Sequence, residues 1–117
     1  MIADELSDED DRMTWVIYLK GIIRGYYMIR RYVNECHLIN IAIEPSYQRS
    51  GLGETLIKHL LERNPSKSSI FLEIKKSNFS AIKLYLKMGF KEIYNRKNYY
   101  QDGSRALIMN FNSKRNM

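Results

Sequence analysis

The stretch YQRSGLGETL, residues 47–56, marks the point at which the periodicity of the chain changes, and it decides how the fold is read. Before it, in CHLINIAIEP, isoleucines alternate with other residues at a period of two, which predicts a strand that Pro45 ends. After Gly51, leucine and isoleucine recur on one face of a predicted helix, which ends at Asn64 and the following proline. The stretch therefore predicts a loop between a strand and a helix.

This loop carries two glycines, Gly51 and Gly53, at the start of the predicted helix. Glycines let the backbone approach a ligand closely, and the free N–H groups and dipole of a helix start favour an anion. We expect a phosphate or pyrophosphate there, although an ordinary glycine-containing turn explains the two glycines equally well. The loop has neither the Gly-Lys-Ser/Thr of a Walker A motif nor the third glycine of the dinucleotide fingerprint.

The segments on either side give further strand and helix signals. Residues 14–33 are rich in β-branched and aromatic residues and predict two antiparallel strands joined at Lys20-Gly21. Residues 69–75 predict a buried strand, and residues 77–90 predict a helix with Gly89 as its left-handed C′ residue. Two further strands are expected at about 90–95 and 105–111. The order β-β-β-α-β-α-β-β predicts an α/β (α+β) fold with a mixed sheet covered by helices.

The length of 117 residues and the hydrophobic content of 44% predict one compact domain with a single core. Residues 1–13 contain six acids and no aromatic residue, and we expect a disordered acidic tail there. The domain is expected to span residues 14–112, followed by a basic tail at 113–117.

The formal net charge of +6 comes from a basic body behind the acidic opening. Such a body attracts phosphates, but a solvated lysine-rich surface explains the composition equally well. Cys36 is the only cysteine, and neither it nor His37 or His59 has partners at a recognisable spacing, so we expect no disulfide and no metal site. No apolar run is long enough to span a bilayer and the opening is unlike a signal peptide, so we expect a cytoplasmic protein without a membrane partner.

Several motifs in combination resemble the GCN5-related N-acetyltransferase (GNAT) family. They are NIAIEP, the Gln-x-x-Gly-x-Gly loop, LEIKKSN and AIKLYLKMGFKE, and the resemblance runs from about residue 21 to residue 111. Within the family, LEIKKSNFSAIKLYLKMGF and RKNYYQDGSRALIMNF look most like the type that acetylates the N-terminal alanine of a ribosomal protein. The resemblance implies a mixed, mostly antiparallel twisted sheet flanked by helices, here without the usual first strand and first helices.

The resemblance also implies acetyl-CoA as cofactor, with its pyrophosphate on the loop and its pantetheine arm along the preceding strand. Asn78 matches a position that hydrogen-bonds this arm, but it can equally cap its helix. The implied cofactor-binding residues are Ile41, Ala42, Ile43, Gln48, Arg49, Ser50, Gly51, Leu52, Gly53, Glu54 and Asn78.

Two residues match the catalytic positions of the family. Glu73 lies in an apolar strand, where a carboxylate is costly without a partner or a role, and the resemblance implies a general base. A Glu paired with Lys or Arg on a solvated strand face is the alternative. Tyr85 matches the general acid, although it also falls on the apolar stripe of its helix.

For the acceptor side, the resemblance implies that Tyr99 and Tyr100 line a groove for the N-terminus of a protein, in particular a ribosomal protein. Two loop aromatics without function are the alternative. The helices that normally wall this groove are absent from the sequence, so we expect the exposed face and edge to pair with a second copy or another subunit. Three other functions remain open: acetylation of another amine such as a lysine, polyamine or antibiotic, non-catalytic binding of coenzyme A or a partner, and nucleic-acid binding. The last has no recognisable recognition motif.

Overall fold

The structure is a computed structural model that describes residues 2–7, 11–64, 68–97, 99 and 101–112. In this part of the chain seven strands form one sheet in the order β1-β2-β3-β4-β5-β7-β6. The strands are β1 Ile2–Ser7, β2 Arg12–Leu19, β3 Ile22–Tyr32, β4 Glu35–Ile43, β5 Ser69–Lys75, β6 Lys91–Arg96 and β7 Ala106–Asn112. The helices are α1 Leu52–Arg63 and α2 Phe79–Lys87, with a short 3-10 turn at Pro45–Tyr47. Neither α-helix is long and apolar enough to cross a membrane.

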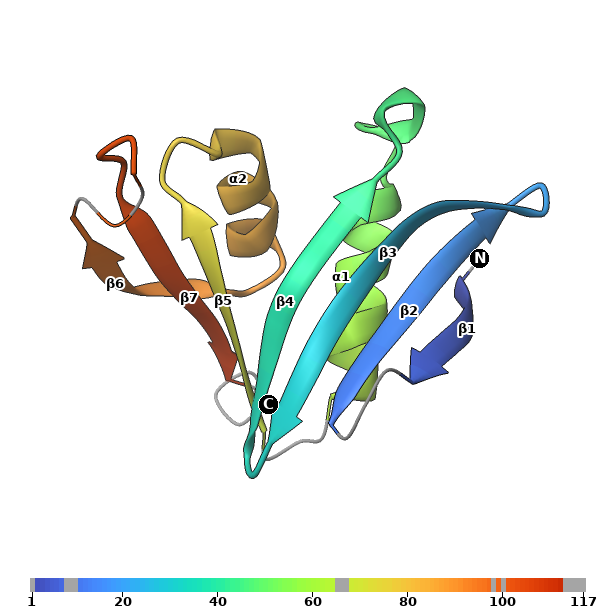
Figure 1. Cartoon of the computed structure of the whole chain (residues 1–117), viewed down its shortest axis with the longest axis horizontal. Coiled ribbons are helices and arrows are strands. Elements are labelled where there is room, and N and C mark those ends of the chain that lie inside the picture. The colour runs from blue at the N-terminus through green and yellow to red at the C-terminus, as the bar shows by residue number, and fades with distance from the viewer. Residues whose placement is uncertain (1, 8–10, 65–67, 98, 100, 113–117) are drawn as a thin grey trace.

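The topology confirms the predicted mixed, mostly antiparallel sheet. Strands β4 and β5 run parallel, whereas every other neighbouring pair is antiparallel (Figure 1). The hairpin between β2 and β3 turns at Lys20 and Gly21, both at positive φ, as the sequence predicts. Helix α2 ends as expected, because Gly89 at φ 102° donates its N–H to the carbonyl of Leu86 at 3.1 Å.

The opening segment differs from its prediction. Ile2–Ser7 forms strand β1, which pairs antiparallel with β2, and β2 already begins at Arg12. The prediction of disorder over residues 1–13, and of a sheet that lacks a strand before residue 14, is therefore wrong for these stretches. A strand ladder is made by backbone groups, so an acidic segment without apolar periodicity can still pair along an edge. The predicted tail at 113–117 lies outside the described residues.

The core lies on the face of the sheet that both helices cover. Helix α1 contributes Leu56, Ile57 and Leu60, as its periodicity predicts, and α2 contributes Tyr85. The stripe expected on α2 is only partly buried, because Phe79 and Leu86 are 75% and 54% exposed. The strand residues of the core cluster are Trp15, Ile17, Tyr27, Ile29, Cys36, Leu38, Ile70, Leu72, Ile74, Leu107 and Met109.

The sheet opens between its two parallel strands. The register joins Glu35–Leu38 of β4 to Ser69–Leu72 of β5, and no pairing continues beyond these residues in the described chain. Figure 1 shows the two strands diverging from this point toward the start of α1 and toward α2. A register shift between Met28 and Ile29 leaves Ile39 of β4 without a partner in β3, which is a β-bulge. The bulge lies where the divergence begins.

Candidate active site

A cavity of about 480 Å³ lies beside this opening, and we call it the β4–β5 cavity. Its lining comes from β4, β5 and β7. The lining residues are Glu35, His37, Leu38, Ile39, Phe71, Leu72, Glu73 and Ile108. The carboxylate-bearing side chains Glu35 and Glu73 are both exposed, so a solute can reach them.

Glu73 reaches this cavity because of the alternation along β5. Its neighbours Leu72 and Ile74 are buried in the core, so the Glu73 side chain points to the opposite face of the sheet. In β7 it lies opposite Ile108, an apolar neighbour. Among the described residues Glu73 has no ion pair with Lys or Arg. The alternative of a Glu held in a surface salt bridge therefore finds no support.

The anion site that the sequence predicts lies at the start of α1. Gly51 precedes the helix at φ 89°, and in the described chain no side chain caps its first turn. The N–H groups of that turn are consequently available to a ligand. Arg49 also has a positive φ of 66°, which shapes the loop ahead of the helix, and the Ser50 hydroxyl donates to the carbonyl of Tyr47. A loop held in this way can present its backbone N–H groups without large rearrangement.

The first turn of α1 also contacts α2. A Cβ on Gly53 would stand 3.3 Å from Cδ2 of Leu84, so glycine permits this close approach. Glu54 is paired across the helices with Lys87 at 3.3 Å. Leu52 packs against the core cluster. The predicted loop residues therefore serve partly to dock α1 against α2 and partly to expose backbone donors.

The edge of β4 above the divergence is the second element of the predicted cofactor site. The N–H of Glu44 donates to the carbonyl of Arg24 in β3, and backbone direction alternates along a strand. It follows that Ala42 turns its backbone groups to β3, whereas Ile41 and Ile43 turn theirs toward the opening. The Gln48 side chain donates to the Ile43 carbonyl at 3.2 Å, which agrees with this direction. Of the three β4 residues, Ile41 and Ile43 are thus placed to offer backbone groups.

Tyr85 lies on α2 with its ring in the core. The side chain is 5% exposed, and its ring meets that of Phe90 edge-on with centroids 5.4 Å apart. Burial raises the pKa of Tyr85 to about 12, so its hydroxyl keeps its proton at neutral pH. Tyr85 therefore belongs to the apolar stripe of α2, and its role as general acid stays a prediction.

For the reaction that the resemblance implies, we expect replacement of Tyr85 with phenylalanine to lower kcat by about 100-fold while the fold is kept, because the ring remains and the proton donor is lost. The native state holds the Tyr85 proton more tightly than the unfolded chain. The stabilisation is therefore complete below pH 10 and declines as the pH rises toward 12. The free energy of unfolding, measured in urea, should therefore fall less between pH 7 and pH 10.5 in Tyr85→Phe than in the wild-type protein.

The matched control is Tyr94→Phe, because Tyr94 lies exposed on β6, outside the core cluster to which Tyr85 belongs. It should change neither kcat nor the alkaline decline. A Tyr85→Phe enzyme with wild-type kcat would contradict the role of the hydroxyl.

Asn78, Tyr99 and Tyr100 are the remaining residues of the predicted site. Asn78 caps α2, since its Oδ1 accepts from the N–H of Ala81 at 3.3 Å, and a contact with a cofactor stays a prediction. Tyr99 stacks under the guanidinium of Arg96, 5.0 Å from its ring centroid, and does not line the cavity. Tyr100 lies outside the described residues.

The sequence did not indicate the hydrogen-bond partners of His37 and His59, which are a carboxylate and a hydroxyl. His37 Nε2 lies 2.8 Å from Oε1 of Glu35, two residues earlier on the same strand face, which an i, i+2 search of the strand would have found. His59 Nδ1 lies 2.7 Å from the hydroxyl of buried Tyr27, a pairing from a distant strand that no local pattern signals. Desolvation, followed by the nearby Arg63 charge, lowers the pKa of His59.

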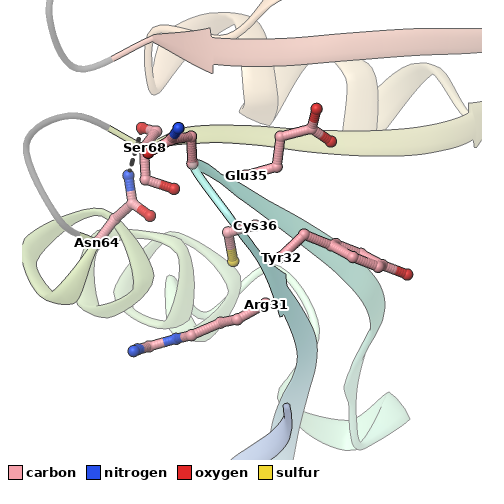
Figure 2. A pocket seen from close by; sticks show the side chains of 7 residues that line it. Arg31, Tyr32, Glu35, Cys36, Asn64 and Ser68 are labelled. Carbon is pink, nitrogen blue, oxygen red and sulfur yellow. Dashed lines mark hydrogen bonds between the residues drawn. The ribbon is translucent and has the colours of Figure 1, made fainter.

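A smaller cavity of about 180 Å³ lies at the other end of β4, where β4 and β5 are still paired (Figure 2). It is lined by Arg31, Tyr32, Asn34, Glu35, Cys36, Asn64 and Ser68. The Cys36 side chain is buried, and burial raises the pKa of its thiol to about 11. At neutral pH the thiol is therefore protonated and a poor nucleophile.

Comparison with known proteins supplies the family. The acetyltransferase (GNAT) family model matches residues 2–90. The [ribosomal protein bS18]-alanine N-acetyltransferase of Escherichia coli K12 is 38% identical over 109 residues, covering 88% of this chain and 74% of that protein. The crystal structure of the Escherichia coli ribosomal-protein-S18-alanine N-acetyltransferase matches with a TM-score of 0.83 and 33% identity, covering 89% and 70% of the two chains. A GNAT acetyltransferase from Elizabethkingia anophelis with acetyl-CoA bound shares the fold, with a TM-score of 0.80 and 19% identity.

Proposed function

Because the chain belongs to the acetyltransferase (GNAT) family and is an acetyl-CoA-dependent N-acetyltransferase, we propose that it acetylates the N-terminal α-amine of a protein, with Glu73 as general base and Tyr85 as general acid. The observation that carries this proposal is the placement of the two groups. Glu73 points into the β4–β5 cavity on the face without helices, whereas Tyr85 lies on the helix face. An amine and an acetyl donor can therefore approach the opening from opposite faces of the sheet.

The residues at the opening fit acetyl-CoA. The uncapped start of α1 suits the pyrophosphate, and Arg49 is exposed beside it. The β4 edge at Ile41 and Ile43 suits an extended amide-containing chain, which would pair with it as an added strand. When bound, acetyl-CoA supplies an acetyl thioester. A backbone N–H at this edge would favour negative charge on the carbonyl oxygen.

The protons are handled by the two named side chains. An α-amine has a reference pKa of about 7.7–8.0, so at neutral pH it must lose a proton before it acts as a nucleophile. The exposed carboxylate of Glu73 accepts that proton, directly or through one water, and passes it to solvent. After attack on the thioester carbonyl, Glu73 accepts the second proton that the nitrogen loses as the amide forms. The Tyr85 hydroxyl keeps its proton at this pH and donates it to the departing sulfur.

The acceptor is inferred from the relatives and from the cavity. The Escherichia coli relative is named for the alanine of ribosomal protein bS18. We infer that a protein N-terminus, such as that of a ribosomal protein, is the acceptor here as well. The β4–β5 cavity is open to solvent, and none of the described residues that line it is Lys or Arg, which suits an incoming amine. The exposed face of the sheet is also proposed to contact a second copy or a partner subunit.

Release of coenzyme A from acetyl-CoA in the presence of different amines tests this proposal. Three acceptors should be compared: a peptide with a free N-terminal alanine and blocked lysines, the same peptide with a blocked N-terminus and one free lysine, and spermidine. We expect turnover with the first peptide to exceed the other two by at least about 100-fold. Faster turnover of lysine or spermidine would assign another amine. Binding of acetyl-CoA without turnover of any acceptor would assign a non-catalytic domain.

A further inference from the structure

His37 is held in a fixed orientation inside the β4–β5 cavity. Its ring contacts two aromatic rings, with centroid distances of 4.7 Å to Tyr32 and 5.7 Å to Phe71. Its Nε2 lies 2.8 Å from Oε1 of Glu35. Since a carboxylate only accepts hydrogen bonds, Nε2 carries the hydrogen, and in the neutral ring Nδ1 is left as an acceptor. The imidazole is therefore a preoriented group rather than a freely rotating surface side chain.

The distance from His37 to the proposed base follows from the register. His37 of β4 is level with Phe71 of β5, and Glu73 is two residues further along β5 on the same face. A strand rises about 3.3 Å per residue, so the two side chains are separated by about 6.6 Å along the strand direction. An extended peptide with its amine at Glu73 would place its second or third residue beside His37.

The chemistry around His37 favours hydrogen-bond donors. Glu35 is a carboxylate whose side chain is 48% exposed, and the His37 side chain is 39% exposed, so both are accessible from the cavity. In the part of the chain that the structure describes, the remaining lining consists of apolar side chains and Glu73, without lysine or arginine. A cationic side chain is the group that such a lining would attract, while an acidic one would be repelled.

From this geometry we propose that Glu35 and His37 form an acceptor subsite, which binds a lysine or arginine side chain at the second or third residue of the acceptor. The aromatic rings of Tyr32 and Phe71 hold the imidazole, and Glu35 supplies the charge. The inference rests on the proposed acetylation of an N-terminal amine. It adds to that proposal the kind of side chain, a basic one, that follows the amine in the acceptor.

Steady-state kinetics with three peptides tests the subsite. All three begin with a free alanine and differ only at the second and third residues, which are arginine, glutamine or glutamate. We expect kcat/KM to fall about tenfold from the arginine to the glutamine peptide, mainly through KM, and to fall further for glutamate. In Glu35→Gln, the ratio between the arginine and glutamine peptides should shrink to about twofold. His37→Ala should raise KM for the arginine peptide. His37→Gln keeps a hydrogen-bond acceptor, so its KM should lie between those of His37→Ala and the wild-type enzyme.

Glu92→Gln is the matched control, because Glu92 is an exposed glutamate on β6 outside the cavity. It should leave the order of the three peptides unchanged. Equal kcat/KM for all three peptides in the wild-type enzyme would overturn the subsite while leaving N-terminal acetylation intact. Equal loss of kcat on every peptide in Glu35→Gln would also overturn it. Turnover of lysine or spermidine but of none of the peptides would overturn the subsite together with the proposed function.

Discussion

Replacing Glu73 with glutamine should lower kcat on an N-terminal peptide by about 100- to 1000-fold, which corresponds to about 3–4 kcal/mol of transition-state stabilisation. Glutamine keeps the size of the side chain but cannot accept the amine proton. Glu73 is exposed on the face without helices, so the substitution should leave stability nearly unchanged. The affinity for acetyl-CoA should change by less than about twofold, because the proposed cofactor site lies at Ile41, Ile43 and the start of α1.

The pH dependence separates a base from a binding group. Above about pH 9 the α-amine is already neutral, so the defect of Glu73→Gln should narrow by about tenfold relative to pH 7. Glu92→Gln, on exposed β6, serves as the control and should match the wild-type enzyme at both pH values. A variant that keeps wild-type kcat at pH 7, or that loses acetyl-CoA binding instead, would contradict the assignment.

Replacing Gly25 with alanine should lower the free energy of unfolding by about 3 kcal/mol. An added Cβ would stand 2.8 Å from the Ala42 carbonyl oxygen and 2.8 Å from Cδ1 of Ile43. The carbonyl belongs to the backbone of β4, so it can yield only if the strand shifts. Because that strand edge is the proposed site for the cofactor chain, the affinity for acetyl-CoA should fall as well. Urea unfolding and acetyl-CoA titration measure the two effects.

The control for this substitution is Gly21→Asn. Gly21 lies in the β2–β3 turn at φ 77°, with nothing within 4 Å of an added Cβ, and asparagine tolerates this backbone conformation. We expect a loss of stability below about 1 kcal/mol and no change in acetyl-CoA affinity. A Gly25→Ala protein as stable as Gly21→Asn would mean that β4 yields more easily than its packing indicates.

The sequence predicts those elements whose stability depends on local pattern. Both helices, the Lys20-Gly21 hairpin and the C′ glycine Gly89 follow from periodicity and turn chemistry, and the structure confirms each. Strand β1 could not be predicted, because its backbone pairing leaves no apolar alternation in an acidic segment. The bulge at Ile39 could not be predicted for a related reason: period-two alternation continues through the sequence even where the ladder shifts by one residue.

The candidate site shows the same division. Glu73 stands out in the sequence because a carboxylate interrupts an apolar strand, and the structure places it at the cavity. For both Asn78 and Tyr85 the sequence allows a structural role and a functional one. The structure shows the structural roles, a helix cap for Asn78 and a core ring for Tyr85, and the functional roles stay predictions. The Glu35–His37 pair depends on which face of β4 is open to solvent. That property comes from tertiary structure and from no local motif.

We propose that this chain acetylates the N-terminal α-amine of a protein, with Glu73 as the general base. Tandem mass spectrometry of a peptide with both a free N-terminal alanine and an internal lysine, after incubation with the enzyme and acetyl-CoA, shows which amine carries the acetyl group. We predict a single acetyl group on the α-amine, lost from the product of Glu73→Gln and retained with Glu92→Gln. An acetyl group on the lysine instead, or an unmodified peptide from an enzyme that binds acetyl-CoA, would contradict the claim.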